Sequence, residues 1–347
     1  MKPPFDLIII NYTLDSNNQL LSHQLDVVNA LSTKFKHILV ITSSVGSAKL
    51  PSNVEVIDLH WRQNRPFSNL VNFYRKIFPV IRDNKKVPIF SHMTQIQSML
   101  IGPFTVLFGN KHVLWYAHKH FPMSLRIATL FVSEIVTSTL GSCPIKGQKV
   151  VAIGQAIDDS KFIPKPFCMK FNKLIHVGRL DKSKNIDMLI EAANEFRILG
   201  YPVSLEFIGE VAARDSVLWL HELKRNTKQY VDTGWLKFHS SIPRAQISKK
   251  LSEYDVFIHA YTGSLDKTLL EATLVELPVV TINEEYTKIF GSWSKSSDLT
   301  LKTEYEALIR MDSTKIKNEI IRRRNLAKSE HSFSSWIDKL SIIIRQN

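Results

Sequence analysis

A chain of 347 residues is too long for one ordinary domain and fits two domains of typical size. Hydrophobic residues make up 44% and charged residues 22%, which excludes a disordered chain because enough apolar surface is present to offset chain entropy. The formal net charge of +13 favours a polyanionic partner, whether nucleic acid, anionic lipid or a phosphorylated substrate.

Cysteine usage and apolar stretches indicate where the protein works. Cys143 and Cys168 are too few for a secreted disulfide framework and lack the spacing of a metal site. We therefore expect a reducing compartment, the cytoplasm. Residues 1–15 do not have the shape of a signal peptide, and the longest apolar stretches, such as residues 99–108, are too short to span a bilayer.

Short apolar runs alternate with helix-period segments in the first half, which is the pattern of βαβ architecture with parallel strands. The candidate strands are residues 7–10, 38–42, 54–59, 87–90, 113–116, 135–137 and 150–153. Helical periodicity is clearest at residues 24–31 and 70–81. Together these elements predict a Rossmann-like α/β domain over residues 1–165.

Prolines at 164 and 166 indicate an interdomain linker at residues 162–169, after which a second alternating series begins. Its candidate strands are residues 174–177, 205–208, 236–238, 256–259 and 279–282, with helices at 186–196 and 217–224. We expect a second Rossmann-like domain over residues 166–330. A basic helical tail follows, and packing of residues 331–347 back on the N-terminal domain is one arrangement for it. Ligands of such folds bind beyond the carboxyl ends of parallel strands, in a cleft.

The first candidate binding segment is H-V-G-R-L-D-K-S-K-N, residues 176–185, at the end of a predicted strand. Gly178 permits close backbone approach, while Arg179 and Lys184 place two cations before the start of a helix. Two cations beside helix amides suit a diphosphate. The alternative is a solvated basic loop that caps a helix.

The second candidate segment is Y-T-G-S-L-D-K-T-L-L-E-A, residues 261–272, which again joins a predicted strand to a helix. Glu271 lies in a mostly apolar stretch of that helix, and its carboxylate accepts two hydrogen bonds at once. The two neighbouring hydroxyls of a ribose match that capacity. The alternative is an exposed helix residue, the commonest place for glutamate.

Both segments resemble the retaining GT-B glycosyltransferases of family 4, also called group 1. Residues 178–185 match the family signature G-R-L-x-x-x-K-G/N, and residues 263–280 resemble its E-x7-E region, which ends L-L-E-A-M-A-x-G-x-P-V-V. Residues 151–162 are similar to the family segment I-x-N-G-I-D-x-x-x-F, with Gln155 at the usual asparagine and Ala156 at the usual glycine. The resemblance implies an α/β fold of two Rossmann-like domains facing each other across a cleft.

The resemblance also implies which residues bind the donor. The family's first glutamate falls at Gly263 here, so contacts with the transferred sugar would pass to Ser264, Asp266 or bare backbone amides. Glu271 falls on the second glutamate, which binds ribose. The donor-binding residues implied are Gly178, Arg179, Lys184, Gly263, Ser264, Leu265, Asp266 and Glu271.

Histidines follow the predicted strand at 113–116, in the sequence A-H-K-H. A histidine there can hydrogen-bond the donor sugar or a developing charge; the alternatives are a packed loop histidine or a metal ligand together with His120. The resemblance favours His118 as the sugar contact and joins it to Arg179 and Lys184 as the catalytic set. Residues 12–23 contain no glycine, so a dinucleotide fingerprint is absent. Asp15, His23 and Gln24 are the candidate acceptor residues.

No D-x-D triplet occurs, which favours a reaction that needs neither metal nor cofactor, with Arg179, Lys184 and helix N-termini stabilising the departing diphosphate. The resemblance implies hexosyl transfer with retention, from a nucleotide-diphosphate-sugar to a hydroxyl of a glycan or lipid-linked acceptor, in cell-surface polysaccharide or lipopolysaccharide biosynthesis. The alternatives are a catalytically weak homologue that binds nucleotide-sugar or glycan in a biosynthetic complex, and a GT-B nucleotide-sugar epimerase.

Residues 69–86 mix aromatic side chains with five basic ones, so they could rest on an anionic membrane and place the protein peripherally at its inner face. The more common arrangement for such a helix is a core-facing side with a solvated basic side. Nucleic acid is not an expected partner, because the basic residues are dispersed rather than gathered in a recognised motif.

Overall fold

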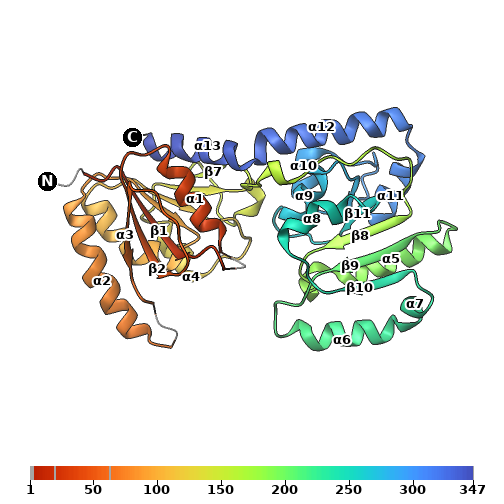
Figure 1. Ribbon diagram of the computed structural model, residues 1–347, viewed down its shortest axis with the longest axis horizontal. Coiled ribbons are helices and arrows are strands. Elements are labelled where there is room, and N and C mark those ends of the chain that lie inside the picture. Colours follow the sequence, from red (N-terminus) through yellow and green to blue (C-terminus); the bar gives the residue numbers. More distant parts are fainter. Residues whose placement is uncertain (1–3, 19–20, 62–63, 347) are drawn as a thin grey trace. The chain divides into compact units, whose positions relative to one another are not determined.

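The computed structural model of the protein describes residues 4–18, 21–61 and 64–346 (Figure 1). The chain divides into two compact units, residues 1–154 with 334–347, and residues 155–333. Each unit is a parallel sheet covered by helices. The expected series of twelve strands is present, with ends that differ from the predicted ones by a few residues.

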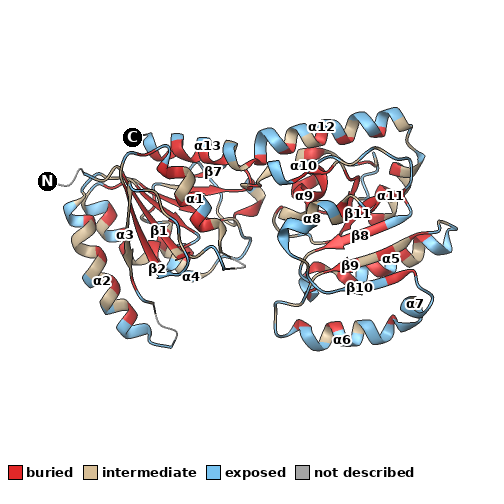
Figure 2. Cartoon of the chain, viewed as in Figure 1, coloured by how far each residue is buried: buried red, intermediate tan, exposed pale blue. Residues whose placement is uncertain are grey.

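The first unit contains a seven-stranded parallel sheet in the order β3-β2-β1-β4-β5-β6-β7. Its strands are β1 Leu7–Leu14, β2 Ile38–Val45, β3 Val54–Asp58, β4 Ile89–His92, β5 His112–Trp115, β6 Glu134–Thr137 and β7 Val150–Ala152. Its helices are α1 His23–Ser32, α2 Pro66–Asp83, α3 Gln95–Leu107, α4 Met123–Ala128 and α13 Phe333–Arg345. The central strands are mostly apolar because both sheet faces are covered by helices, and Figure 2 shows them as buried.

Alternation along β4 shows which helices cover which face. Ile89 belongs to the cluster formed by α2 and α3, which includes Phe73 and Ile101. The next residue, Phe90, points to the other face, where its ring centroid lies 6.3 Å from that of Trp336 on α13. The final helix of the chain therefore completes the core of the first unit.

The second unit contains a five-stranded parallel sheet in the order β10-β9-β8-β11-β12. Its strands are β8 Lys173–Val177, β9 Ser204–Ile208, β10 Leu236–His239, β11 Val256–His259 and β12 Val279–Thr281. Its helices are α5 Ile186–Ile198, α6 Ser216–Asn226, α7 Lys228–Asp232, α8 Arg244–Leu251, α9 Lys267–Leu274, α10 Glu284–Phe290, α11 Leu301–Arg310 and α12 Ser313–His331.

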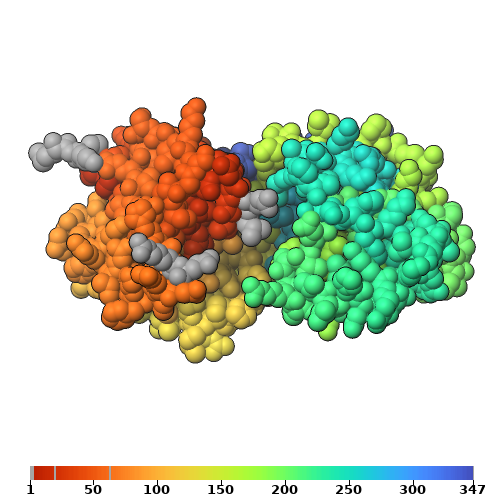
Figure 3. Space-filling view, turned by 60° about the horizontal axis from the view of Figure 1, so that its bottom comes forward, coloured from red at the N-terminus to blue at the C-terminus, as the bar shows by residue number. Residues whose placement is uncertain are grey.

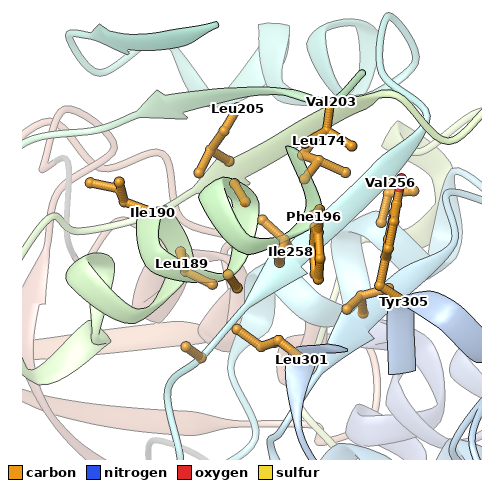
Figure 4. Packing of buried hydrophobic residues seen from close by; sticks show 14 of the residues in the cluster. Leu174, Leu189, Ile190, Phe196, Val203, Leu205, Val256, Ile258, Leu301 and Tyr305 are labelled. Carbon is orange, nitrogen blue, oxygen red and sulfur yellow. The ribbon is translucent and has the colours of Figure 1, made fainter. Parts of the chain in front are cut away.

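Two apolar clusters hold the second unit together, one on each side of its sheet. In the cluster of Figure 4, Phe196 of α5 stacks on Tyr305 of α11 with ring centroids 4.2 Å apart, in the same cluster as strand residues such as Leu174. The other cluster joins α9, α10 and α12 through residues such as Leu270 and Phe290. Each fully buried side chain of this size contributes about 2 kcal/mol relative to an exposed one.

Residues 162–169 are not a free linker, contrary to the sequence-based expectation. Phe162 is buried in the second unit's core, and the amide of Lys165 donates to the carbonyl of Val275 at 3.0 Å. Further upstream, the amide of Ile157 donates to the carbonyl of His331 at 2.8 Å. The division between units falls after residue 154 rather than at 165, because this extended segment packs on the second sheet's helices. No helix in the described part of the chain has the length and hydropathy needed to cross a membrane.

Candidate active site

The two predicted donor segments lie side by side at the carboxyl-terminal end of the strands of the second sheet. Strands β8 and β11 are hydrogen-bonded neighbours and run parallel, with Leu174 in register with Val256. The loops that follow them, residues 178–185 and 260–266, therefore emerge side by side at the carboxyl ends of the strands. Asn185 joins them, because its side-chain amide donates to the carbonyl of Ala260 at 2.9 Å.

Gly178 is held by the neighbouring strand. Its amide donates to the carbonyl of Ile208 at 3.0 Å, and its φ of 153° is one that side chains rarely allow. A Cβ atom at Gly209, after β9, would lie 1.8 Å from the carbonyl oxygen of Gly178. Gly209 is thus a second required glycine, which sequence reasoning missed although a glycine directly after a strand was visible.

Arg179 remains accessible while its direction is set by a buried acid. Its side chain is 58% exposed, and Nη1 lies 3.3 Å from Oδ2 of Asp181. The other oxygen of Asp181 accepts hydrogen bonds from the amides of Ala212 and Ala213 at 2.9 and 3.0 Å. This arrangement anchors the carboxylate, so the guanidinium is oriented without being buried. Asp181 was not predicted as a site residue.

Lys184 lies deeper, in a pocket of compensating contacts. Its side chain is 8% exposed, forms a short ion pair with Asp266, and places Nζ 3.8 Å from the ring centroid of Tyr261. A buried ammonium needs such partners, because an unpaired charge in the interior is costly. Burial would raise the pKa of Asp266, but His259 and Lys184 outweigh burial and hold the pKa well below its usual range.

Side chains outside the loop hold the carbonyl groups of residues 260–266. Asn283 donates from Nδ2 to the carbonyl of Tyr261 at 2.8 Å, with the carbonyl of Ser264 at 3.4 Å. Gln155 donates from Nε2 to the carbonyl of Leu265 at 2.5 Å. Because C=O of one residue and N–H of the next point in opposite directions across a peptide, the amides of Leu265 and Asp266 point away from these clamps. The loop therefore presents N–H groups on its other side.

Tyr261 closes the position where the family's first glutamate would stand. A Cβ atom at Gly263 would lie 2.0 Å from the phenolic oxygen of Tyr261. A side chain at residue 263 therefore cannot coexist with the tyrosine in this orientation. Tyr261 in this orientation therefore requires a glycine at position 263, where the family has a glutamate.

Glu271 is buried in α9 and is paired with an arginine that the sequence did not reveal. Oε1 of Glu271 lies 2.5 Å from Nη2 of Arg244, at the start of α8; the two side chains are 2% and 63% exposed. Burial raises the pKa of the Glu271 carboxyl, and Arg244 and Lys267 offset that only in part. Burial likewise lowers the pKa of Lys267.

The candidate residues of the first unit lie after β1 and β5. Asp15 accepts hydrogen bonds from the amides of Asn17 and Ser47, and buried Gln24 accepts from the amides of Tyr12 and Thr13, so both brace turns. His23, the third member of the predicted acceptor set, is half-buried, and its ring centroid lies 5.4 Å from that of His92. Residues 19 and 20 of the same segment lie outside the described residues.

His118 is exposed after β5, and its Nδ1 accepts a hydrogen bond from the amide of His120 at 2.9 Å. In the neutral ring this places the hydrogen on Nε2. Across the described residues, no three His, Cys, Asp or Glu side chains gather in a way that could hold a metal ion.

Several solved structures share this fold over nearly the whole chain. HepE of Anabaena, in complex with UDP and glucose, matches with a TM-score of 0.71 at 14% identity, covering 99% of this chain and 100% of that one. A glycosyltransferase from Rickettsia africae matches with a TM-score of 0.71 at 12% identity, covering 98% and 97%. Sucrose-phosphate synthase from Thermosynechococcus elongatus matches with a TM-score of 0.70 at 11% identity, covering 98% of each chain. These likenesses confirm the GT-B fold, with two Rossmann-like domains.

The family model described as glycosyl transferases group 1 matches residues 158–289, which include both loops of the site. This part of the second unit is therefore similar to the group 1 glycosyl transferases, and the chain has the GT-B fold. The predicted family resemblance is confirmed. A search of curated protein sequences gave no match.

Proposed function

We propose that this protein transfers a sugar from a nucleotide-diphosphate-sugar to a hydroxyl of a glycan or lipid-linked acceptor, with retention at the anomeric carbon and without a metal ion. One observation carries the proposal: Arg179, Lys184 and the buried carboxylate of Glu271 belong to segments that follow the adjacent strands β8 and β11. HepE structures hold UDP and UDP-glucose, which supports a nucleoside-diphosphate donor.

The diphosphate is bound by charge and by helix amides. Arg179 offers a planar fork that Asp181 orients, and Lys184 has three N–H donors, so its pairing with Asp266 leaves two for phosphate oxygens. Helix α5 begins without a side-chain cap, which leaves its first amides open to an anion. These groups stabilise the negative charge that develops on the leaving diphosphate.

Glu271 binds the ribose in this proposal, and Arg244 must then share or release the carboxylate. An exposed arginine side chain moves readily, while the buried carboxylate stays in place. The transferred sugar contacts Asp266 and the amides of Ser264 and Leu265. For the first unit we keep the sequence-based predictions unchanged: His118 contacts the donor sugar, and Asp15, His23 and Gln24 serve the acceptor.

We also propose that α2 rests on an anionic membrane, where a lipid-linked acceptor would be met. One side of α2 packs in the core through Phe73 and Ile77, while Phe67 and Val71 are exposed next to the exposed Arg75. Phe67, Val71 and Arg75 line a hollow of about 520 Å³. The part of the chain that contains α2 is orange in Figure 3. Exposed apolar side chains among cations suit the headgroup region of a membrane. The protein would then lie at the cytoplasmic face.

A panel of nucleoside diphosphates and their glucose conjugates tests the reaction, with calorimetry for binding and product analysis for transfer. We expect one nucleoside diphosphate to bind, and its sugar to be transferred with retained configuration in the presence of EDTA. If no nucleoside diphosphate binds, the donor site proposed here is wrong.

A second candidate function is a catalytically weak nucleotide-sugar-binding protein, favoured by the closure of position 263 by Tyr261. Tight binding of a nucleotide-sugar without transfer or hydrolysis would support it. Interconversion of the nucleotide-sugar itself, seen by NMR, would indicate an epimerase instead.

A further inference from the structure

A buried histidine lies directly behind Asp266. His259, the last residue of β11, is fully buried, and its Nδ1 lies 3.2 Å from Oγ1 of Thr281 on β12. Its Nε2 lies 3.5 Å from Oδ2 of Asp266. That distance is long for a hydrogen bond, but such contacts are often long in unliganded sites and tighten when substrate binds. The proposed reaction assigns no role to the His259 ring.

The surroundings select one tautomer of His259. Burial lowers the pKa of the ring, so it is neutral and carries a single N–H. Oγ1 of Thr281 already accepts from the amide of Asn283 at 3.1 Å, which leaves its own O–H to donate to Nδ1. The ring hydrogen is therefore on Nε2, where it faces a carboxylate. The other tautomer would direct a lone pair at that negative charge.

Within the described part of the chain, the side chain of Asp266 is held through one of its two oxygens. Lys184 and His259 both approach Oδ2, and the side chain makes no capping hydrogen bond to α9. The contacts described for this carboxylate thus leave Oδ1 uncommitted. Asp266 is 22% exposed, whereas Lys184 and His259 are buried, so the carboxylate is the part of the cluster that a ligand reaches.

We propose that His259, set by Thr281, is a positioning residue that holds the Asp266 carboxylate so that its second oxygen accepts a hydrogen bond from a hydroxyl of a neutral sugar. This inference rests on the proposed function, since it assigns the transferred sugar to the same site. An ionised carboxylate only accepts hydrogen bonds, so a hydroxyl fits it and a second carboxylate is repelled. The donor class is therefore a nucleotide-linked neutral hexose rather than a uronic acid.

The test separates recognition of the sugar from recognition of the nucleotide. Affinities for UDP, GDP and ADP, and for their glucose conjugates, are measured by calorimetry, and the tightest nucleotide defines the pair of probes. The ratio of the two affinities is the contribution of the sugar. In His259→Phe we expect this ratio to fall about tenfold while nucleoside-diphosphate affinity changes less than about twofold, as for loss of one charged hydrogen bond.

Three further variants exclude a merely structural effect. His259→Gln keeps an N–H near the Nε2 position and should restore most of the ratio, and Thr281→Val should lower it partially. His176→Phe is the matched control, because this neighbouring buried ring bonds to the carbonyl of Ile258 and not to Asp266. Melting curves verify that each variant folds. If His259→Phe does not fold, the affinity ratio is compared between the wild type, His259→Gln and Thr281→Val.

Charge selectivity gives an independent readout. Asp266→Asn should reduce the preference for the glucose conjugate over the glucuronic acid conjugate by about tenfold, since a repulsive charge is removed. If the affinity ratio is unchanged in His259→Phe and the preference for the glucose conjugate is unchanged in Asp266→Asn, the inference is wrong, but the proposed function is not affected. A wild-type protein that binds none of the nucleotides would overturn the proposed function together with it.

Discussion

Arg244 and Glu271 form an ion pair of unequal burial: the guanidinium is largely exposed and the carboxylate is almost fully buried, with 2.5 Å between Nη2 and Oε1. The pair places a movable cation over a fixed acid. It links α8 to α9, two helices that no motif in the sequence connects.

Removing either partner of this pair has different consequences. We expect Arg244→Met to lower the free energy of unfolding by about 1–3 kcal/mol, because the buried carboxylate loses a charged partner. Glu271→Gln should weaken nucleoside-diphosphate binding about tenfold or more, since a neutral amide accepts less well from two ribose hydroxyls. Urea unfolding and calorimetry measure the two effects. Lys249→Met, on the exposed side of α8, is the control, and equal stability of Arg244→Met and Lys249→Met would contradict the interpretation of the pair.

The cations of the β8 loop should control turnover. Arg179→Met and Lys184→Met are each expected to reduce kcat about 10²–10³-fold, as for loss of a group that stabilises charge in the transition state. Lys182→Met is the matched control, because this exposed lysine lies in the short 3-10 helix Lys182–Lys184 that also contains Lys184; it should retain activity within about twofold. Wild-type turnover in both site variants would refute the assignment of the diphosphate to this loop.

A steric test applies to the glycine that replaces the family's glutamate. Gly263→Ala should destabilise the protein by about 1–3 kcal/mol, since the new methyl group would overlap the phenol of Tyr261. The double variant Tyr261→Ala with Gly263→Ala should recover most of that loss, which a double-mutant cycle of unfolding free energies detects. Additive costs in the double variant would mean that the two side chains do not compete for space.

Each unit contains a buried neutral histidine. We therefore expect the free energy of unfolding to fall in acid. Burial lowers the pKa of His112 and of His176 to about 3, against 6.5 for the exposed ring. Between these values the unfolded chain binds a proton that the folded chain does not, so stability falls as pH drops below 6.5. By pH 5 we expect a loss of about 2 kcal/mol for each ring. Thermal unfolding between pH 7 and 5 measures this, and His112→Gln and His176→Gln should each show a weaker dependence on pH than the wild type.

Membrane association can be tested on the exposed apolar residues of α2. Phe67→Asp and Val71→Asp should reduce sedimentation with vesicles containing anionic phosphatidylglycerol, because a carboxylate is repelled where an apolar side chain would insert. Ile198→Asp changes an equally exposed residue of the second unit and should leave sedimentation unchanged. Equal losses in all three variants would indicate a nonspecific effect of charge.

The sequence was most informative about buried strands and about the loops that follow them. Fully buried parallel strands read as continuous apolar runs, so β8 and β11 could be located, and with them Arg179 and Glu271. The contacts of those residues could not be predicted, because no periodic pattern relates positions far apart in the chain. Lys184 and Asp266 are separated by 82 residues, and Arg244 and Glu271 by 27.

Two predictions based on proline differ from the structure. Around residues 164 and 166 it indicated a linker, but the extended backbone that proline favours packs on the second unit. The apolar stretch at residues 99–108 was not predicted as helical, yet α3 continues through Pro103. A single proline weakens a helix, but burial of Ile101 and its neighbours compensates for the lost hydrogen bond.

The position of α13 has a consequence for how the protein is made. Trp336 packs against Phe90 and Trp115 in the first unit, although the whole second unit is synthesised between them. A nascent chain that has emerged only to residue 154 lacks this indole and exposes the apolar surface that it covers. Maturation of the unit translated first must therefore wait for residues 334–346, so a ribosome that stalls within the second unit leaves behind an incomplete, aggregation-prone intermediate.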